Sequence, residues 1–419
     1  MKKSFLRKLL LVAGSVLVTL VIVELCLRIT GFSDPTLLYI SDRDRGIALR
    51  PLAEGWWRNE GAAYIRINGD GLRDREHARA KPAGTLRIAV LGDSYAEALQ
   101  VPLEDTFWSE IERRLQTCQN TNGRKVEVLN FGVSGYGTAQ ELITLRQHVW
   151  DYSPDIVLLA FTTGNDLNDN LAQLSNDTLR PYFVYRDDKL MLDMSTLNPR
   201  NASLRFRLRQ SSAGNLFVWF RDRLRVIQLL NVGLRAITTS GESKHDRSLK
   251  GGDHQSGENA VPANRAGGAL LGASELTEPG LEERAYYEPT DEVWKEAWRV
   301  TEGLISEMHD EVKNHGARFA VVTLSSPVQV SPNADEYEQT LRSSGLKDLF
   351  YPERRIAALG QRRTFPVLNL APLLKAYAEQ HRIYLHGFDS QLGRGHWNRS
   401  GHRAAGEMIG DWLCLSSVP

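Results

Sequence analysis

Three short apolar runs, each followed by a tight polar turn, constrain the fold of this 419-residue chain more than any other feature. The runs are RIAVL at 87–91, VEVLNF at 126–131 and DIVLLAF at 155–161, and helical patterns follow the first two. Strands that alternate with helices form parallel sheets. Apolar runs without polar alternation are typical of strands covered by helices on both faces. The sequence therefore predicts a doubly wound, parallel α/β sheet.

The same pattern returns in the last third of the chain, after an interruption at 176–288. The elements expected there are a helix at 291–315, strands at 317–324 and 365–370, and a final helix that begins near Ser400. Within the interruption, residues 240–280 are rich in Gly, Ser, Asn and charge, which leaves too little apolar surface for a stable fold. We expect one α/β domain in two halves, 85–175 and 289–419, split by a partly disordered insertion.

The insertion also contains one amphipathic helical pattern. Its apolar positions are Leu216, Phe217, Phe220, Leu224, Ile227 and Leu234, and arginines lie between them. The simpler interpretation is a helix that packs its apolar stripe on the main domain. The alternative is a basic, aromatic face that lies on a membrane or on an anionic glycan.

The N-terminus has the pattern of a membrane anchor. Basic residues precede an uncharged run at 9–23, and the apolar stretch continues to Ile29, with Glu24 and Arg28 spaced so that they can pair. A cleaved signal peptide is the alternative, but no small-x-small site follows the run. Nor does a small residue precede Cys26, as it would in a lipoprotein. We expect a single-pass anchor at 1–30.

The basic N-terminal flank predicts that this end stays in the cytoplasm. Everything after the anchor, beginning with a lead-in segment at 31–84, is then periplasmic or extracellular. The 51 basic and 51 acidic residues cancel, so no global field attracts nucleic acid, and we expect no nucleic-acid partner. Three scattered cysteines exclude a thiolate metal site, and we expect neither metal nor cofactor.

A disulfide between Cys118 and Cys414 is one expectation of the fold. Cys118 ends the helix after the first strand and Cys414 lies in the final helix, and in such sheets these helices are commonly neighbours. An oxidising compartment permits the bridge. Two separate buried thiols are the alternative.

Ser94 stands in a tight turn, Gly92-Asp93-Ser94, directly after the first strand. A hydroxyl nucleophile needs a sharp turn, a base within reach and donors for the developing oxyanion. The carboxyl ends of parallel strands are also where open α/β sheets bind ligands. Alone, the tripeptide is a common turn, so its interpretation depends on the residues at the ends of the next two strands.

Suitable donors stand after both of those strands. Gly135, five residues after Asn130, can bring a backbone N–H close to a substrate because it has no side chain. Asn165 carries an amide donor suited to an oxyanion hole, and Asp166 can fix its loop by accepting backbone hydrogen bonds. His396, just before the final helix, is the predicted general base. His402 is a weaker alternative, better explained as a residue at the start of that helix.

In this order, the four blocks resemble the SGNH (GDSL) hydrolase superfamily, whose motifs contribute Ser, Gly, Asn and His. The resemblance covers about 85–170 and 290–415. It implies a flavodoxin-like three-layer fold, with Ser94 as nucleophile and His396 as base. It also implies that the Ser94 backbone N–H, Gly135 and Asn165 donate to the oxyanion. The lead-in NGDGLR at 68–73 and the anchor ending in ELCLR look like membrane-tethered bacterial members associated with envelope polysaccharides.

The chain departs from the family pattern at two positions. Thr163 replaces the usual Gly two residues before Asn165, which is a mild change. Gly393 occupies the place of the Asp that usually precedes the His by three residues. The triad acid is therefore open: we consider Asp389, a Ser/His dyad in which a backbone carbonyl accepts the imidazole proton, and a more distant carboxylate.

The sequence thus predicts a membrane-anchored serine esterase that hydrolyses O-acyl, most simply O-acetyl, esters of envelope or extracellular carbohydrate. Its expected partners are an ester-bearing carbohydrate or lipid substrate and the inner membrane. One alternative is an O-acyltransferase that uses the same site. The other is a non-catalytic polysaccharide-binding or assembly subunit on the same fold.

Overall fold

The computed structural model describes residues 2–32, 38–175, 177–230, 233 and 283–416. The chain divides into two compact units. One comprises 1–38 and 204–275, and the other comprises 39–203 and 276–419. The segment 240–280, which we expect to be disordered, lies outside the described residues.

A five-stranded parallel sheet forms the centre of the larger unit. Its strand order is β11-β10-β7-β5-β6. The strands are β5 (Thr85–Leu91), β6 (Lys125–Asn130), β7 (Ile156–Thr162), β10 (Arg318–Leu324) and β11 (Val367–Asn369). In this register Val90 is opposite Asn130 on one side, and Leu91 is opposite Leu159 on the other. The carboxyl ends of β5, β6 and β7 therefore meet at one edge.

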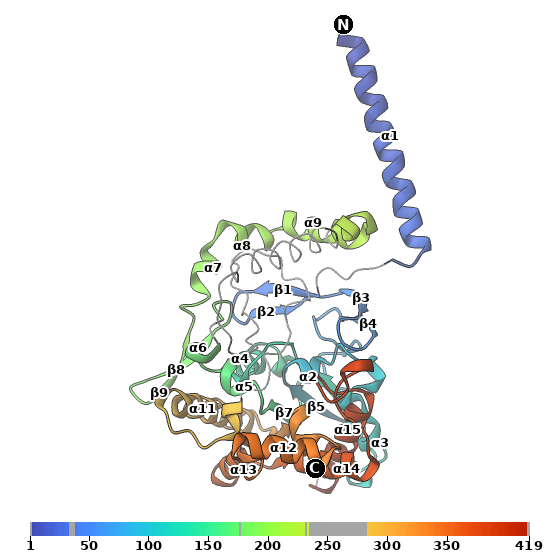
Figure 1. Ribbon diagram of the computed structural model, residues 1–419. Coiled ribbons are helices and arrows are strands. Elements are labelled where there is room, and N and C mark those ends of the chain that lie inside the picture. Colours follow the sequence, from blue (N-terminus) through green and yellow to red (C-terminus); the bar gives the residue numbers. More distant parts are fainter. Residues whose placement is uncertain (1, 33–37, 176, 231–232, 234–282, 417–419) are drawn as a thin grey trace, which may run out of the picture. The chain divides into compact units, whose positions relative to one another are not determined.

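Helices cover both faces of this sheet (Figure 1). On one face they are α3 (Phe107–Gln116), α14 (Leu370–His381) and α15 (Arg399–Leu415), and on the other α4 (Thr138–Gln147), α11 (Glu292–Asn314) and α13 (Tyr351–Arg363). Successive residues of a strand point to opposite faces. Accordingly Ile88 and Val90 pack in one apolar cluster, while Ala89 and Leu91 pack in the other. The predicted doubly wound α/β sheet is confirmed.

The described residues of this unit also form three small hairpins and several short helices. The hairpins pair β1 (Tyr39–Asp42) with β2 (Gly46–Leu49), β3 (Glu54–Trp57) with β4 (Ala63–Arg66), and β8 (Tyr182–Arg186) with β9 (Lys189–Asp193). The short helices are α2 (Ser94–Glu97), α5 (Asp166–Asp169), α6 (Ala172–Ser175), α7 (Asn198–Ala202) and α12 (Ala334–Ser344). The β1–β2 and β3–β4 hairpins belong to the lead-in segment, and they position part of the site.

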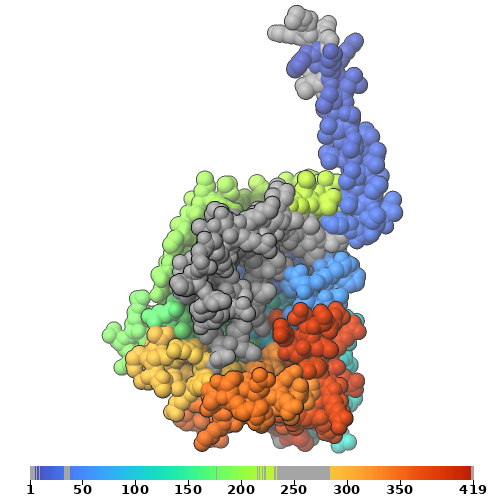
Figure 2. Space-filling view, in the orientation of Figure 1, coloured from blue at the N-terminus to red at the C-terminus, as the bar shows by residue number. Residues whose placement is uncertain are grey.

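In the space-filling view, the orange and red residues of the C-terminal part of the chain lie together at the bottom (Figure 2).

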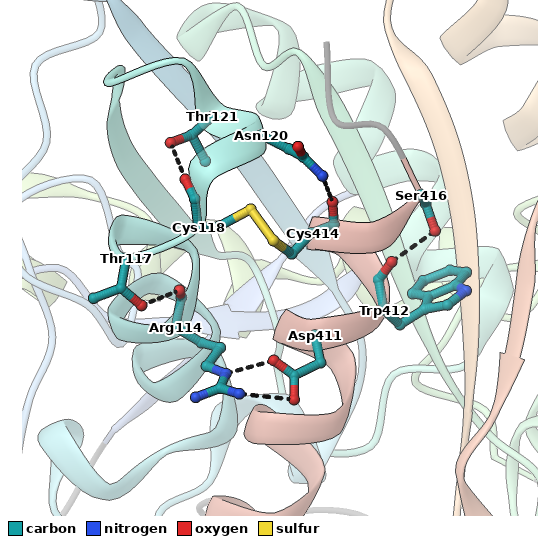
Figure 3. Close-up of a disulfide and its surroundings, with 9 residues drawn as sticks. All are labelled: Arg114, Thr117, Cys118, Asn120, Thr121, Asp411, Trp412, Cys414 and Ser416. Atoms are coloured by element: carbon teal, nitrogen blue, oxygen red, sulfur yellow. Dashed lines mark hydrogen bonds and ion pairs between the residues drawn. A yellow bond between two sulfur atoms is a disulfide. The ribbon is translucent and has the colours of Figure 1, made fainter.

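A disulfide joins Cys118, just after α3, to Cys414 on α15 (Figure 3). The two Cα atoms are 5.9 Å apart, which confirms the predicted bridge. The helices approach closely because α15 carries glycines where α3 crosses it. A Cβ on Gly406 would lie 2.4 Å from the Cβ of Glu110, and one on Gly410 would lie 2.7 Å from that of Arg114.

The smaller unit contains α1 (Lys2–Ile29), α8 (Leu204–Arg209) and α9 (Ser212–Arg223). Among the described residues, Leu10–Ile29 is the one helical stretch long and apolar enough to cross a membrane. Arg28 Nε donates to Glu24 Oε1 at 2.8 Å, so these two residues pair as their spacing predicts.

Candidate active site

Ser94 is the first residue of α2 and comes directly after the turn that ends β5. Asp93 caps this helix, because its Oδ1 accepts a hydrogen bond from the Tyr95 N–H at 3.0 Å. Gly92 is needed for close packing: a Cβ there would lie 2.9 Å from the Cβ of Ala96. The Gly-Asp-Ser tripeptide thus forms a sharp, capped turn that starts a helix at Ser94.

Asn165, after β7, contacts the same turn. Its Nδ2 donates to Asp93 Oδ2 at 3.1 Å, so Asp93 fixes both the turn at Ser94 and the Asn165 amide. An amide nitrogen carries two hydrogens, and this bond uses one of them. Asp166 accepts the Thr162 N–H at 2.8 Å, as its position predicts. Burial, with Glu141 and Asp93 nearby, raises the pKa of Asp166 well above its usual value.

The loop after β6 is held by Glu97, at the end of α2. The buried Glu97 carboxylate accepts hydrogen bonds from the Ser134 N–H and from the Tyr39 hydroxyl, the latter at 2.8 Å. Burial raises the pKa of Glu97, although these donors and Arg73 oppose the shift. Gly135 comes after Ser134 with a φ of +76°, a conformation that favours glycine. Glu97 therefore ties the Gly135 loop to the helix that begins at Ser94.

Arg73, in the lead-in motif, binds the C-terminal end of α2. Its buried guanidinium donates to the carbonyls of Glu97, Ala98 and Val101. These groups lie at or just beyond the end of α2, where carbonyls lack partners within the helix. The sequence identifies this motif only through the family resemblance, and the structure shows which carbonyls its arginine satisfies.

His396 lies in the loop before α15, and its closest acidic partner is Glu60. Glu60 Oε2 is 2.5 Å from His396 Nδ1, and Glu60 Oε1 accepts the His396 backbone N–H at 2.7 Å. Glu60 comes from the turn between β3 and β4. Gly395 makes room for it, since a Cβ at that position would lie 2.2 Å from Glu60 Oε1. The carboxylate therefore holds the loop and the imidazole together.

The carboxylate beside His396 Nδ1 is that of Glu60 and not that of Asp389. Asp389 is exposed and lies in a short turn with a φ of +49°. Its loop closes through the Gly387 N–H, which donates to the His396 carbonyl, and the Gly393 N–H, which donates to the His386 carbonyl. These bonds form the loop without using the Asp389 carboxylate. Glu60, a more distant carboxylate in the sequence, occupies the position beside Nδ1.

Buried aromatic rings support His396. The Tyr95 ring centroid is 5.1 Å from that of His396 and 5.1 Å from that of Trp397. His386 Nδ1 is 2.8 Å from the Gly395 carbonyl, so His386 holds the residue before His396. His402 is buried and accepts the Phe107 N–H at 3.3 Å, and burial lowers its pKa well below the usual value. These contacts place His402 in the first turn of α15, at the start of the final helix.

Two contacts bring Ser94, Asn165 and His396 to one edge of the sheet. Asp93, directly before Ser94, contacts Asn165, and Tyr95, directly after Ser94, contacts His396. A pocket of about 370 Å³ opens beside Tyr95 and Asn165. Its other walls include Ser326, Val328, Glu336 and Arg394. Within the described residues, no group of three or more His, Cys, Asp and Glu side chains could hold a metal ion.

No family model matches the sequence, and a search of curated proteins finds no match. Among solved structures, the chain is similar to an acetyl xylan esterase at 11% identity and a TM-score of 0.36, over 80% of this chain and 100% of that one. It is also similar to a catalytic mutant of an acetylxylan esterase from Geobacillus stearothermophilus, at 10% identity and a TM-score of 0.35, over 77% and 92%. A third is a GDSL-like lipase from Bacteroides thetaiotaomicron, at 10% identity and a TM-score of 0.32, over 82% and 93%. With its four sequence blocks in order, the chain is similar to the SGNH (GDSL) hydrolases.

Proposed function

We propose that this protein is a serine esterase in which Ser94 is the nucleophile, His396 the general base and Glu60 the residue that orients the base. The observation that carries the proposal is the 2.5 Å contact between Glu60 Oε2 and His396 Nδ1. A carboxylate in this position fixes the imidazole tautomer and stabilises the imidazolium that forms when the base takes a proton.

These roles define the proposed reaction. Ser94 Oγ attacks the ester carbonyl carbon while His396 takes the hydroxyl proton, and the Nδ1–H remains bonded to Glu60. The backbone N–H groups of Ser94 and Gly135 and the second Nδ2 hydrogen of Asn165 stabilise the oxyanion. His396 then gives the proton to the leaving alcohol, and an acyl group stays on Ser94. Water, activated by the same base, releases the acid and restores the enzyme.

The substrate we propose is an O-acyl, most simply O-acetyl, ester of an envelope or extracellular carbohydrate. The apolar stretch Leu10–Ile29 supports a membrane anchor, and the Cys118–Cys414 disulfide supports an oxidising compartment. The pocket also supports a polar alcohol moiety, because Ser326, Glu336 and Arg394 line it with groups that can bond sugar hydroxyls.

The test is the reaction of the full-length protein with 4-nitrophenyl acetate and with a fluorophosphonate probe. Ser94→Ala is expected to lower turnover by at least about 10⁴-fold and to abolish labelling, because only the hydroxyl forms the covalent intermediate. Ser390→Ala, at an exposed serine, is the matched control and should leave both unchanged. Labelling of Ser94→Ala at the rate of the unchanged protein would contradict the mechanism. Absence of any activity in the unchanged protein would favour a non-catalytic glycan-binding role.

A further inference from the structure

The last turns of α1 are joined to the chain just beyond α9. Arg28 Nη2 donates to the Arg223 carbonyl at 2.5 Å, and Glu24 Oε2 accepts the Val226 N–H at 3.0 Å. All these residues belong to the smaller unit. Glu24 is also the first charge after the uncharged run at 9–23. If α1 crosses a membrane, Glu24 and Arg28 lie at its surface, and residues 223–226 lie there with them.

The two helices before this junction expose large apolar side chains. In α8, Leu204 is 68% exposed and Leu208 57%, while Phe206, on the opposite side of the helix, is buried. In α9, Leu216 is 56% exposed and Phe220 47%. Each pair is spaced four residues apart and so forms a stripe along its helix. Both stripes are exposed.

The charge around these stripes is strongly positive. Residues 204–230 contain six arginines and one aspartate, although the whole chain is neutral. Arg205 and Arg207 are exposed on either flank of the Leu204 and Leu208 stripe. Basic residues beside an apolar stripe are typical of helices that lie in the headgroup layer of an anionic membrane.

We propose that residues 204–230 form an interfacial arm that lies on the membrane crossed by α1. In this arrangement Leu204, Leu208, Leu216 and Phe220 enter the acyl boundary, and the arginines bind lipid phosphates. An anionic glycan matches the charge but offers no partner for four aliphatic and aromatic side chains. The inference rests on the membrane anchor of the proposed function and adds a second membrane contact to it.

The experiment uses the full-length protein in nanodiscs of phosphatidylethanolamine and phosphatidylglycerol, in a Cys26→Ser background that removes the free thiol. Single cysteines carry an environment-sensitive NBD label: Leu208→Cys and Phe220→Cys in the arm, Leu17→Cys in α1 and Leu373→Cys in the larger unit. Leu373 is the matched control, since it is 44% exposed on another helix. Spin-labelled lipids report contact with the acyl region, and iodide reports contact with water.

We expect labels at 208 and 220 to emit at shorter wavelength and to be quenched several-fold more by spin-labelled lipid than the label at 373. Replacing phosphatidylglycerol with phosphatidylcholine should weaken this quenching. Quenching of Leu17→Cys without quenching at 208 and 220 would overturn the interfacial arm while leaving the anchor intact. A blue shift at 208 and 220 without lipid quenching indicates a protein or glycan partner and also overturns it. Failure of Leu17→Cys to be quenched removes the anchor and this inference together, while the Ser94 test of catalysis stands apart.

Discussion

Ser94, Gly135 and Asn165 come after three neighbouring strands, β5, β6 and β7, whereas His396 and Glu60 come from loops outside the sheet. We call Ser94, Gly135 and Asn165 the nucleophile side of the site, and His396 and Glu60 its base side. On the nucleophile side, each residue lies close in sequence to the strand that positions it. On the base side, the decisive contact joins a hairpin turn of the lead-in segment to a loop near the C-terminus.

The difference shows how the two sides reach their geometry. The nucleophile side is fixed by strand register and by hydrogen bonds such as Asn165 to Asp93. The base side depends on two glycines that let separate segments approach. Gly61 has a φ of +64°, and a Cβ on it would lie 2.3 Å from the Gln100 carbonyl oxygen. Gly395 leaves room for the Glu60 carboxylate in the same way. Substitutions on the two sides should therefore have different signatures.

The largest effect after loss of Ser94 is expected from Glu60→Gln. The amide keeps the size of the side chain but removes the charge that stabilises the imidazolium, so kcat should fall by about 10³- to 10⁴-fold. KM and the melting temperature should change little if Glu60 acts on the base. Steady-state kinetics with 4-nitrophenyl acetate measures this split.

Asp389→Asn is the matched control for Glu60, because it makes the same chemical change at an exposed carboxylate of the base side. It should change kcat by less than about threefold, as surface changes outside the site do. If Asp389→Asn lowers kcat by orders of magnitude and Glu60→Gln does not, the assignment of the acid is wrong.

A smaller effect is expected on the nucleophile side from Asn165→Ala. Loss of one oxyanion donor should lower kcat by about 10²-fold. Labelling of Ser94 by a fluorophosphonate should persist, more slowly, because the nucleophile and base remain. Asn168→Ala, at a neighbouring buried asparagine, controls for damage to α5. An unchanged kcat in Asn165→Ala would remove this residue from the oxyanion hole.

The disulfide connects the two sides, since Cys118 lies just after α3 and Cys414 lies on the helix that starts after His396. Cys118→Ser with Cys414→Ser should lower the free energy of unfolding by about 2–5 kcal/mol, mainly by relaxing a long closed loop of the unfolded chain. Denaturant unfolding measures this change. Below the melting temperature kcat should stay within about threefold, because the cysteines do not contact the site. A large loss of kcat in a folded variant would mean that the bridge also sets the site geometry.

The smallest expected effect is on the pH dependence of the free energy of unfolding. It comes from Glu353, which belongs neither to the nucleophile side nor to the base side. Glu353 is buried against Gln329, and burial raises its pKa from 4.5 to about 7. The folded state then holds this proton more tightly than the unfolded state. Glu353 therefore stabilises the fold below about pH 4.5, and this contribution is lost as pH rises towards 7, by at most about 3 kcal/mol.

Glu353→Gln should flatten the dependence of the free energy of unfolding on pH between 4.5 and 7, which denaturant titration at several pH values can measure. Glu338→Gln, at an exposed position of α12, should leave the slope as it is. The slope will not vanish, because burial also raises the pKa of Asp166 and Glu141. An identical slope in Glu353→Gln and the unchanged protein would contradict the assignment.

The fold and the nucleophile side could be predicted because their signals are local. An apolar run, a Gly-containing turn and a polar residue lie within a few positions of one another in the segments around Ser94 and Asn165. The helices flanking the sheet also placed Cys118 near Cys414. Glu60 could not be identified in this way, because its partner, His396, lies 336 residues away in the sequence.

The one local sign of this contact in the sequence is Gly395, directly before His396. A glycine there is compatible with a loop turn, and only the structure shows that it makes room for a carboxylate. For Glu97, the sequence likewise indicates no more than a residue of a turn or helix end. Its contacts with Ser134 and Tyr39 depend on loops that the strand pattern does not position.

Because Glu60 lies in the β3–β4 turn, its position limits where the chain can be truncated without removing part of the site. The segment whose motifs resemble those of the SGNH hydrolases begins near residue 85, and a fragment cut there keeps Ser94, Asn165 and His396. It lacks the carboxylate beside the imidazole and the arginine beneath α2. If Glu60 acts as proposed, the lead-in hairpins are part of the catalytic domain rather than a spacer after the anchor. Recombination that exchanged the lead-in between relatives would then have to preserve one glutamate and the glycine that admits it.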